Sequence, residues 1–221
     1  MSRTVYITII FFAIIICLLL NLSNTNQCYG EITEPKKYLK KEYRSPEGNI
    51  IVRHYGESID DNSADIWLYS AKHPSKRAML YSYDGDANVL FSHNEKWLVL
   101  NHRYGSDGTN AILFKKIKGL KYEQITSLND FVWDLFKKTH KQYKIPEFDH
   151  SYTYAVFWSS DSKSVMLRTY GHDDLSPTML DPWFCIYDVT TGKMSLDFNR
   201  VFNRDTYHPD GKAKGRELYL D

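Results

Sequence analysis

Cysteine and charge of one sign are both scarce in this sequence. Its 221 residues include 3 cysteines, which is too few for a disulfide framework. The 28 basic and 27 acidic residues leave a net charge of +1, whereas nucleic-acid binding relies on a concentrated basic field. The composition therefore argues against a small disulfide-rich fold and against a nucleic-acid partner.

The usual catalytic motifs are also missing. The sequence contains no glycine-rich phosphate loop, no G-x-S-x-G and no H-E-x-x-H. An enzyme can lack all three, but without them no side chain is singled out for catalysis. We predict no catalytic residue, no metal and no cofactor, and we favour a non-enzymatic function.

Aromatic and hydrophobic residues, in contrast, are plentiful. Hydrophobic residues make up 43% of the chain and aromatic residues 15%, including 17 tyrosines. This is enough for a packed core. Tyrosine and β-branched side chains fit the half-buried surface of a sheet, so the composition favours β-structure.

Residues 1–30 have the pattern of a secretory signal peptide. A basic end precedes an apolar run over residues 5–20, and a polar stretch follows. Cys28 and Gly30 suit the −3 and −1 positions, which predicts cleavage before Glu31. The protein is then secreted or periplasmic. The alternative is an uncleaved membrane anchor over residues 5–20, and only then would a membrane be a partner.

The rest of the chain divides into a lead-in and one domain. Residues 31–47 are charged and rich in lysine; we interpret them as a surface lead-in, with a short amphipathic strand as the alternative. Residues 48–221 are expected to form a β-repeat domain. Apolar runs between turn residues predict strands over 48–55, 65–70, 77–83, 88–91, 96–102, 110–115, 122–126, 152–158, 164–170, 183–189 and 194–198.

One helix is predicted within these strands, near residues 130–141. Apolar residues recur there at helical spacing, Ser127 or Asn129 can cap the start, and Pro146 prevents continuation. The helix also interrupts a repeat. Each of three strands ends in Tyr-Gly, at residues 55, 104 and 170, and the second interval is 17 residues longer than the first. We infer a helix inserted into a repeat of roughly fifty residues.

Two stretches carry the repeat most clearly. FSHNEKW begins at Phe91 and WSSDSKS begins at Trp158, and a fainter strand copy, IIVRHYG, begins at Ile50. The first two resemble the aromatic-Ser-Pro-Asp-Gly-Lys turn of β-propeller repeats of the TolB and WD-repeat kind, although both lack its proline and glycine. IYDVTTGK, over residues 186–193, resembles the outer hairpin of such blades.

This resemblance implies a mainly β fold. It would be an incomplete, propeller-like stack of antiparallel sheets with about three to four blades. A β-sandwich and an open barrel are alternatives that share the same number of strands.

A basic side chain stands two residues before each repeat tyrosine. Residues two apart share one face of a strand, so each copy presents a cation beside a tyrosine. If the copies are equivalent, the pairs line a common opening that binds an anionic ligand or a carbohydrate. The alternative is that the cations pair with loop carboxylates or project into solvent. The candidate ligand-binding residues are Arg53, Tyr55, His102, Tyr104, Arg168, Tyr170 and His172.

His172 also belongs to a possible metal or acid–base cluster, His172-Asp173-Asp174. Three consecutive residues rarely converge on one metal, and no partner with ligand spacing follows them. Asp149-His150 is an equally weak candidate. Cys185 lies in the apolar run WFCIY, where a buried thiol is expected rather than a nucleophile.

The sequence therefore favours an exported β-repeat protein that binds another protein or a surface polymer. One alternative is a hydrolase-like enzyme with a site in the loop around His172. Another is a structural subunit that completes its propeller by self-association, which would make it a homo-oligomer.

Overall fold

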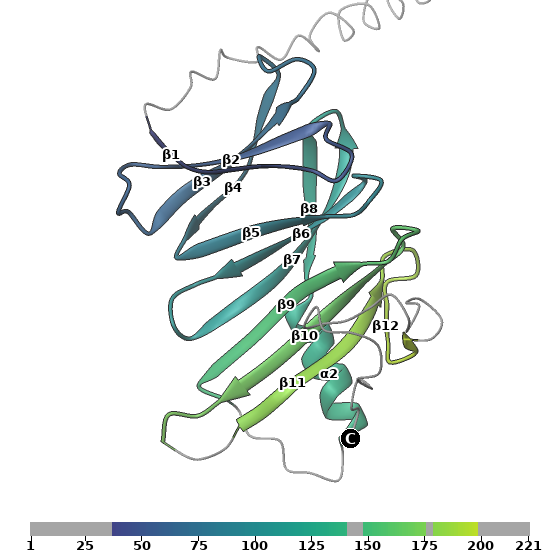
Figure 1. Cartoon of the computed structure of the whole chain (residues 1–221). Helices are drawn as coiled ribbons and strands as arrows, with labels where there is room; N and C mark the ends of the chain where they lie inside the picture. The colour runs from purple at the N-terminus through teal and green to yellow at the C-terminus, as the bar shows by residue number, and fades with distance from the viewer. Residues whose placement is uncertain (1–36, 141–147, 176–178, 199–221) are drawn as a thin grey trace, which may run out of the picture. The chain divides into compact units, whose positions relative to one another are not determined.

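One arrangement of strands occurs three times in the computed structural model, which describes residues 37–140, 148–175 and 179–198 (Figure 1). Each copy is a four-stranded antiparallel meander in which consecutive strands are neighbours. Meander 1 consists of β1 (Tyr38–Arg44), β2 (Ile50–Gly56), β3 (Ser63–Ser70) and β4 (Arg77–Asp84). Meander 2 consists of β5 (Asp86–Phe91), β6 (Trp97–Arg103), β7 (Gly108–Lys118) and β8 (Lys121–Ser127). Meander 3 consists of β9 (His150–Trp158), β10 (Ser164–His172), β11 (Met179–Asp188) and β12 (Lys193–Ser195).

The mainly β fold and the stack of antiparallel sheets are therefore confirmed. Three meanders in series match the lower end of the predicted blade number and not the two facing sheets of a sandwich. Meander 1 is a separate sheet, whereas meanders 2 and 3 join edge to edge. The junction is short: β7 and β9 pair in parallel through Gly108 with Ser151 and Thr109 with Tyr152.

The turn between the first two strands has the same hydrogen bonds in every meander. It starts at Ser45, Ser92 and Ser159, and each hydroxyl accepts a bond of 3.0 Å from the backbone N–H five residues later. The same hydroxyl donates to the carbonyl of that later residue, at 3.2, 3.0 and 3.1 Å respectively. The two repeat turns read from the sequence are therefore equivalent in structure.

The third turn, Ser45-Pro46-Glu47-Gly48-Asn49, was not predicted as a copy of the repeat. It carries the proline and glycine that the other two copies lack. Its fourth residue, Gly48, is in the left-handed region with φ 71°, and the residues at the same position are Glu95 with φ 53° and Ser162 with φ 61°. A left-handed residue is needed at this point of every copy.

Side chains at this left-handed position link each turn to the one before it. The Glu95 carboxylate accepts hydrogen bonds from the Ser45 hydroxyl and, at 3.3 Å, from the Asn49 amide. The Ser162 hydroxyl accepts a bond of 3.1 Å from the backbone N–H of Asn94. The three turns therefore form one hydrogen-bonded series along the edge of the stack.

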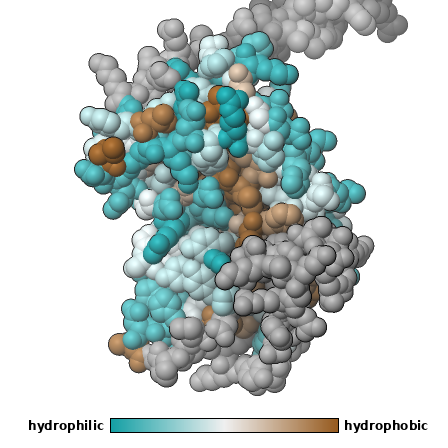
Figure 2. Space-filling view, viewed as in Figure 1, coloured by the Kyte–Doolittle hydropathy of each residue, from teal (hydrophilic) through white to brown (hydrophobic). Residues whose placement is uncertain are grey.

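Two cores separate the three meanders, and β6 contributes to both. Leu98 and Leu100 on one face of β6 pack against meander 1, while Val99 on the other face packs against meander 3; all three side chains are fully buried. This follows from the alternation of side chains along a strand. Figure 2 shows hydrophobic side chains in a band near the centre of the view, within a mostly hydrophilic surface.

Helix α2 (Asn129–Thr139) confirms the predicted helix near residues 130–141. Its Val132 and Phe136 are buried in the core between meanders 2 and 3, and the Phe136 ring lies 5.1 Å from that of Trp183. The predicted capping role of Ser127 or Asn129 is wrong. Leu128 is the N-cap and no side chain caps it, because the Asn129 amide instead bonds the β7 backbone at Ala111 and Thr109.

The interpretation of residues 31–47 as a lead-in is also wrong for part of its length. Tyr38–Arg44 forms β1, which pairs antiparallel with β2, so the short amphipathic strand is the alternative that forms. Hydrogen bonding to β2 determines this result, because most β1 side chains are exposed. Cys185 lies in β11 and is fully buried, as expected, and burial raises the pKa of its thiol.

The predictions for the N-terminal segment concern residues outside the described part. These are the signal peptide over residues 1–30, its cleavage before Glu31 and the alternative anchor over residues 5–20. Among the residues that the structure describes, no helix has the length and hydrophobicity needed to cross a membrane.

Candidate functional site

The first predicted pair, Arg53 and Tyr55, lies on the outer face of meander 1. Val52 on the opposite face of β2 packs into the core with meander 2, so Arg53 points away from it. The Arg53 Nε donates to Glu42 at 2.7 Å, and the guanidinium lies 4.6 Å from the Tyr69 ring centroid. This cation is therefore paired with a carboxylate, which is the alternative considered for it.

The second pair, His102 and Tyr104, lines a cavity of about 400 Å³ between meanders 1 and 2. The charged groups of this cavity largely pair with one another. Lys37 contacts Asp65 at 2.8 Å and Glu57 at 3.0 Å, and its hydrogen bonds to Asp65 and then to Glu57 raise its pKa. Lys37 is thus already neutralised by two carboxylates, so it offers little to a further anionic ligand.

The third pair, Arg168 and Tyr170, lies on the outer face of meander 3. Leu167 on the opposite face packs toward meander 2, so Arg168 points away from that core. The prediction that the three pairs share one opening is wrong. Counted from the turn serine, Tyr55 is 10 residues on and Tyr104 is 12, whereas Tyr170 is 11, and a shift of one residue places Tyr170 on the other face. Tyr55 and Tyr104 share a face but belong to different meanders, and only Tyr104 lines the cavity between them.

The structure instead gathers six polar and aromatic side chains on the outer face of β9 and β10, which we call the aromatic ladder. Each member on one strand is the register partner of a member on the other. The three cross-strand pairs are His150 with His172, Tyr152 with Tyr170, and Tyr154 with Arg168. Three of the seven predicted residues, Arg168, Tyr170 and His172, belong to the ladder.

The rings of the ladder stack along the strands. The Tyr152 and Tyr170 centroids are 4.7 Å apart with planes inclined by 19°, and Tyr170 also stacks on Tyr154 at 6.1 Å. The Arg168 guanidinium lies 5.4 Å from the centroids of both Tyr154 and Tyr170. Contacts of this kind hold the cation in place without neutralising it.

Arg168 differs from Arg53 in its hydrogen bonding. Its Nε is buried and has no hydrogen-bond partner within the described ranges, and a buried donor without an acceptor costs free energy. The two tyrosines beside it carry no negative charge to pair with it: burial raises the pKa of the Tyr170 hydroxyl, and the Tyr154 hydroxyl accepts a bond of 2.9 Å from Thr109. Within the described residues, the middle of the ladder therefore holds a guanidinium between tyrosine rings whose Nε has no acceptor.

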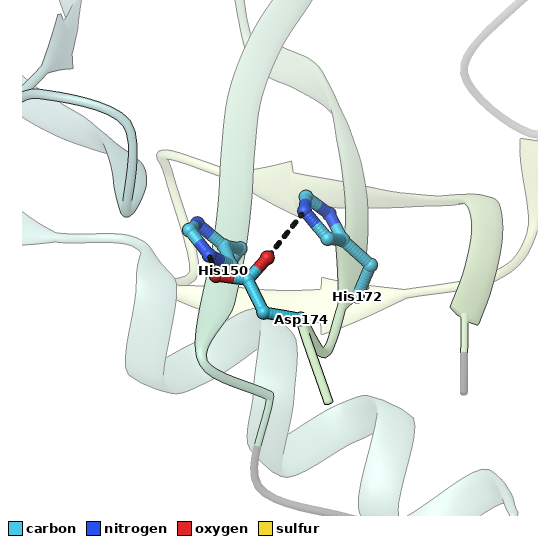
Figure 3. A group of neighbouring side chains, drawn as sticks. All are labelled: His150, His172 and Asp174. Atoms are coloured by element: carbon cyan, nitrogen blue, oxygen red, sulfur yellow. Dashed lines mark ion pairs between the residues drawn. The ribbon is translucent and has the colours of Figure 1, made fainter. Parts of the chain in front are cut away.

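Two histidines and an aspartate form one end of the ladder (Figure 3). The His150 and His172 rings are 4.5 Å apart and nearly parallel, at 5°. Asp174 Oδ2 lies 3.0 Å from His150 Nε2, and Asp174 Oδ1 lies 3.9 Å from His172 Nε2. The contact with Asp174, followed by one with the Ser106 carbonyl, raises the pKa of His150, and His150 in turn lowers the pKa of Asp174.

Comparisons with known proteins show the following. No protein-family model matches the chain, and no curated protein matches it. Among solved structures, TolB from Acinetobacter baumannii is similar with a TM-score of 0.36 and 12% identity, over 72% of this chain and 43% of that one. The Pseudomonas aeruginosa periplasmic gluconolactonase PpgL is similar with a TM-score of 0.33 and 8% identity, over 75% of this chain and 55% of that one. The chain thus spans about half the length of these structures.

Proposed function

We propose that this chain is an exported, non-catalytic β-repeat module that binds an acidic polysaccharide on the aromatic ladder. The observation that carries the proposal is the buried Arg168 Nε, which has no acceptor within the described residues and lies between two tyrosine rings. The pattern of residues 1–30 supports export.

Charge and shape favour a polymer of acidic sugars over a neutral ligand. The apolar faces of sugar rings can stack on tyrosine rings, and the half-buried ladder offers a row of them along β9 and β10. A carboxylate on the sugar would accept a hydrogen bond from Arg168 and neutralise its charge. Bonds between charged groups in such a setting are stronger than neutral ones.

The test is a calorimetric titration of the full chain with polygalacturonate, with dextran as the neutral polymer. We expect binding of polygalacturonate that weakens as salt is added, because salt screens exposed charges, and no binding of dextran. Replacing Arg168 by Gln should reduce affinity by about 10- to 100-fold, the equivalent of a hydrogen bond to a charged group. Tyr170→Ala should also weaken binding, through the lost stacking surface.

Arg53→Gln is the matched control. Arg53 also lies over a tyrosine ring, but it has a carboxylate partner in Glu42, so its loss should leave polysaccharide binding unchanged. The proposal fails if polygalacturonate does not bind at low salt, or if Arg168→Gln binds as well as the original chain. Capture of a protein through the ladder, without polysaccharide binding, would overturn it in favour of a protein partner.

The two remaining alternatives have their own readouts. We expect no turnover on a panel of generic hydrolase substrates; turnover that disappears on replacing His172 by Ala would favour the hydrolase-like alternative. A stable oligomer measured by light scattering, with no polysaccharide binding, would favour the structural subunit.

A further inference from the structure

The histidine end of the ladder brings together three groups that bind metals. One ligand atom from each of His150, His172 and Asp174 lies within 4.8 Å of the other two. The two histidines are 22 residues apart in the sequence, so they are not a consecutive run of the kind that rarely converges on one ion. The antiparallel register of β9 and β10 places them opposite each other.

The surrounding backbone holds these three groups in place. The rings of His150 and His172 stack face to face. The backbone N–H of Asp149 donates to the Asp173 carboxylate at 3.2 Å, which fastens the end of β10 to the start of β9 and orients the next residue, Asp174. Figure 3 shows the Asp174 carboxylate directed toward both rings.

A second set of contacts determines which nitrogen of His150 is available. Its Nδ1 lies 3.1 Å from the Ser106 carbonyl, and a carbonyl oxygen can only accept, so Nδ1 carries the proton. Nε2 lies 3.0 Å from Asp174, so a metal ion would take the place of the proton that these two atoms share, and Nε2 would offer its lone pair to the ion. Metal-binding histidines commonly donate their other N–H to a backbone carbonyl in this way.

We propose that His150, His172 and Asp174 bind a divalent transition-metal ion, with zinc as the best match. Ligands about 2.0–2.1 Å from tetrahedral zinc are about 3.3 Å from one another. The contacts of Asp174 with the two rings, at 3.0 and 3.9 Å, bracket that spacing. Asp174 can adjust because its side chain is 66% exposed. The two stacked rings would also have to tilt away from their parallel arrangement, because zinc lies in the plane of each imidazole that binds it.

The donor set and its exposure define the chemistry of the site. Two imidazoles and a carboxylate suit zinc or iron(II), whereas magnesium prefers oxygen ligands. Three protein donors leave a fourth position on tetrahedral zinc open to solvent. The His172 ring lies 6.1 Å from that of Tyr152, so the three donors lie next to the tyrosines of the ladder. The metal proposal stands independently of the polysaccharide proposal, because it rests on His150, His172 and Asp174, whereas the other rests on Arg168 and the tyrosines of the ladder.

The experiment is a calorimetric titration of the full chain with ZnCl₂ after dialysis against a chelator. We expect one ion per chain and a rise in the unfolding temperature with added zinc, since a ligand that binds the folded state stabilises it. Parallel titrations with iron(II) under anaerobic conditions and with MgCl₂ identify the preferred ion, and magnesium should not bind. Cobalt(II) provides a spectroscopic readout of the coordination geometry.

Single replacements then locate the site. His150→Gln, His172→Gln and Asp174→Asn should each weaken zinc binding by more than about 10- to 100-fold, the loss caused by removing an outer-shell partner alone. His73→Ala, in the exposed loop before β4, is the control and should bind as the original chain does. Circular dichroism shows whether each variant retains its strands.

Two results would overturn the proposal. One is the absence of both heat and thermal stabilisation at millimolar zinc. The other is zinc binding that persists unchanged in all three folded variants, which would assign the ion to other surface groups. Loss of polysaccharide binding without loss of zinc binding, or the reverse, shows which of the two proposals has failed.

Discussion

The link between the turns of meanders 1 and 2 can be measured by replacing Glu95 with Ala. Glu95 is 3% exposed, and its carboxylate accepts hydrogen bonds from Ser45 and Asn49. A hydrogen bond to a charged group contributes about 1.5–3 kcal/mol. Asn49 is exposed and can bond water instead, and Ser45 keeps its bonds to Ile50.

The desolvation of a buried carboxylate offsets part of the gain. We therefore expect Glu95→Ala to lower the free energy of unfolding by about 2 kcal/mol. For a domain of this size that corresponds to a fall of about 4–8 °C in the unfolding temperature. Urea unfolding followed by circular dichroism measures the first quantity, and calorimetry measures the second.

A second variant at the same position separates the hydrogen bonds from the backbone strain. Glu95 has φ 53°, and the equivalent residue in meander 1 is Gly48. A left-handed conformation costs a non-glycine residue about 1–2 kcal/mol, so Glu95→Gly should be more stable than Glu95→Ala by about that amount. Glu47→Ala, in the exposed part of the neighbouring turn, is the control and should change stability by less than about 0.5 kcal/mol.

Equal stability of Glu95→Ala and the original chain would show that the carboxylate links nothing. A lower stability of Glu95→Gly than of Glu95→Ala would show that the left-handed position is not shared by the three turns.

Two further predictions concern pH and the connection between meanders 1 and 2. Burial, followed by the charge of Lys41, lowers the pKa of His54 to about 4, so the unfolded chain binds a proton that the folded chain does not. The free energy of unfolding should be highest above pH 6.5 and fall by about 2–3 kcal/mol as pH drops toward 4. Urea unfolding across this pH range measures the fall. The same fall in His54→Gln would contradict the prediction. Gly85 has φ 90°, and a Cβ there would lie 2.2 Å from the Arg103 carbonyl oxygen. Gly85→Ala should therefore destabilise the protein more than Gly105→Ala. A Cβ at Gly105 meets no atom within 4 Å, so that variant should lose only about 1–2 kcal/mol, the cost of a left-handed alanine. Equal unfolding temperatures for the two variants would show that the clash at Gly85 is relieved.

The strands other than β1, the helix and two of the three repeat turns could be predicted because their signals are local. Side-chain alternation indicates a strand, and apolar residues at helical spacing indicate α2. The third turn also carried a signal, since Ser45-Pro46-Glu47-Gly48-Asn49 has the expected proline and glycine. The lysine-rich character of residues 31–47 concealed it, because β1 is stabilised by pairing with β2 rather than by an apolar face.

The candidate site was predicted less completely, because its geometry depends on register. Aligning Tyr55, Tyr104 and Tyr170 by their Tyr-Gly pairs ignored that they lie 10, 12 and 11 residues after the turn serine. Asp149-His150 was considered alone, and no residue near it in the sequence indicates that His172 is its partner. That information lies in the pairing of β9 with β10.

The sequence by itself determined the β class of this protein, its repeat and the position of its turns, because each depends on residues close together in the chain. Only the tertiary structure decided which face each tyrosine occupies and which distant side chains meet. Strand register controls both, and a shift of one residue exchanges the buried face for the exposed one.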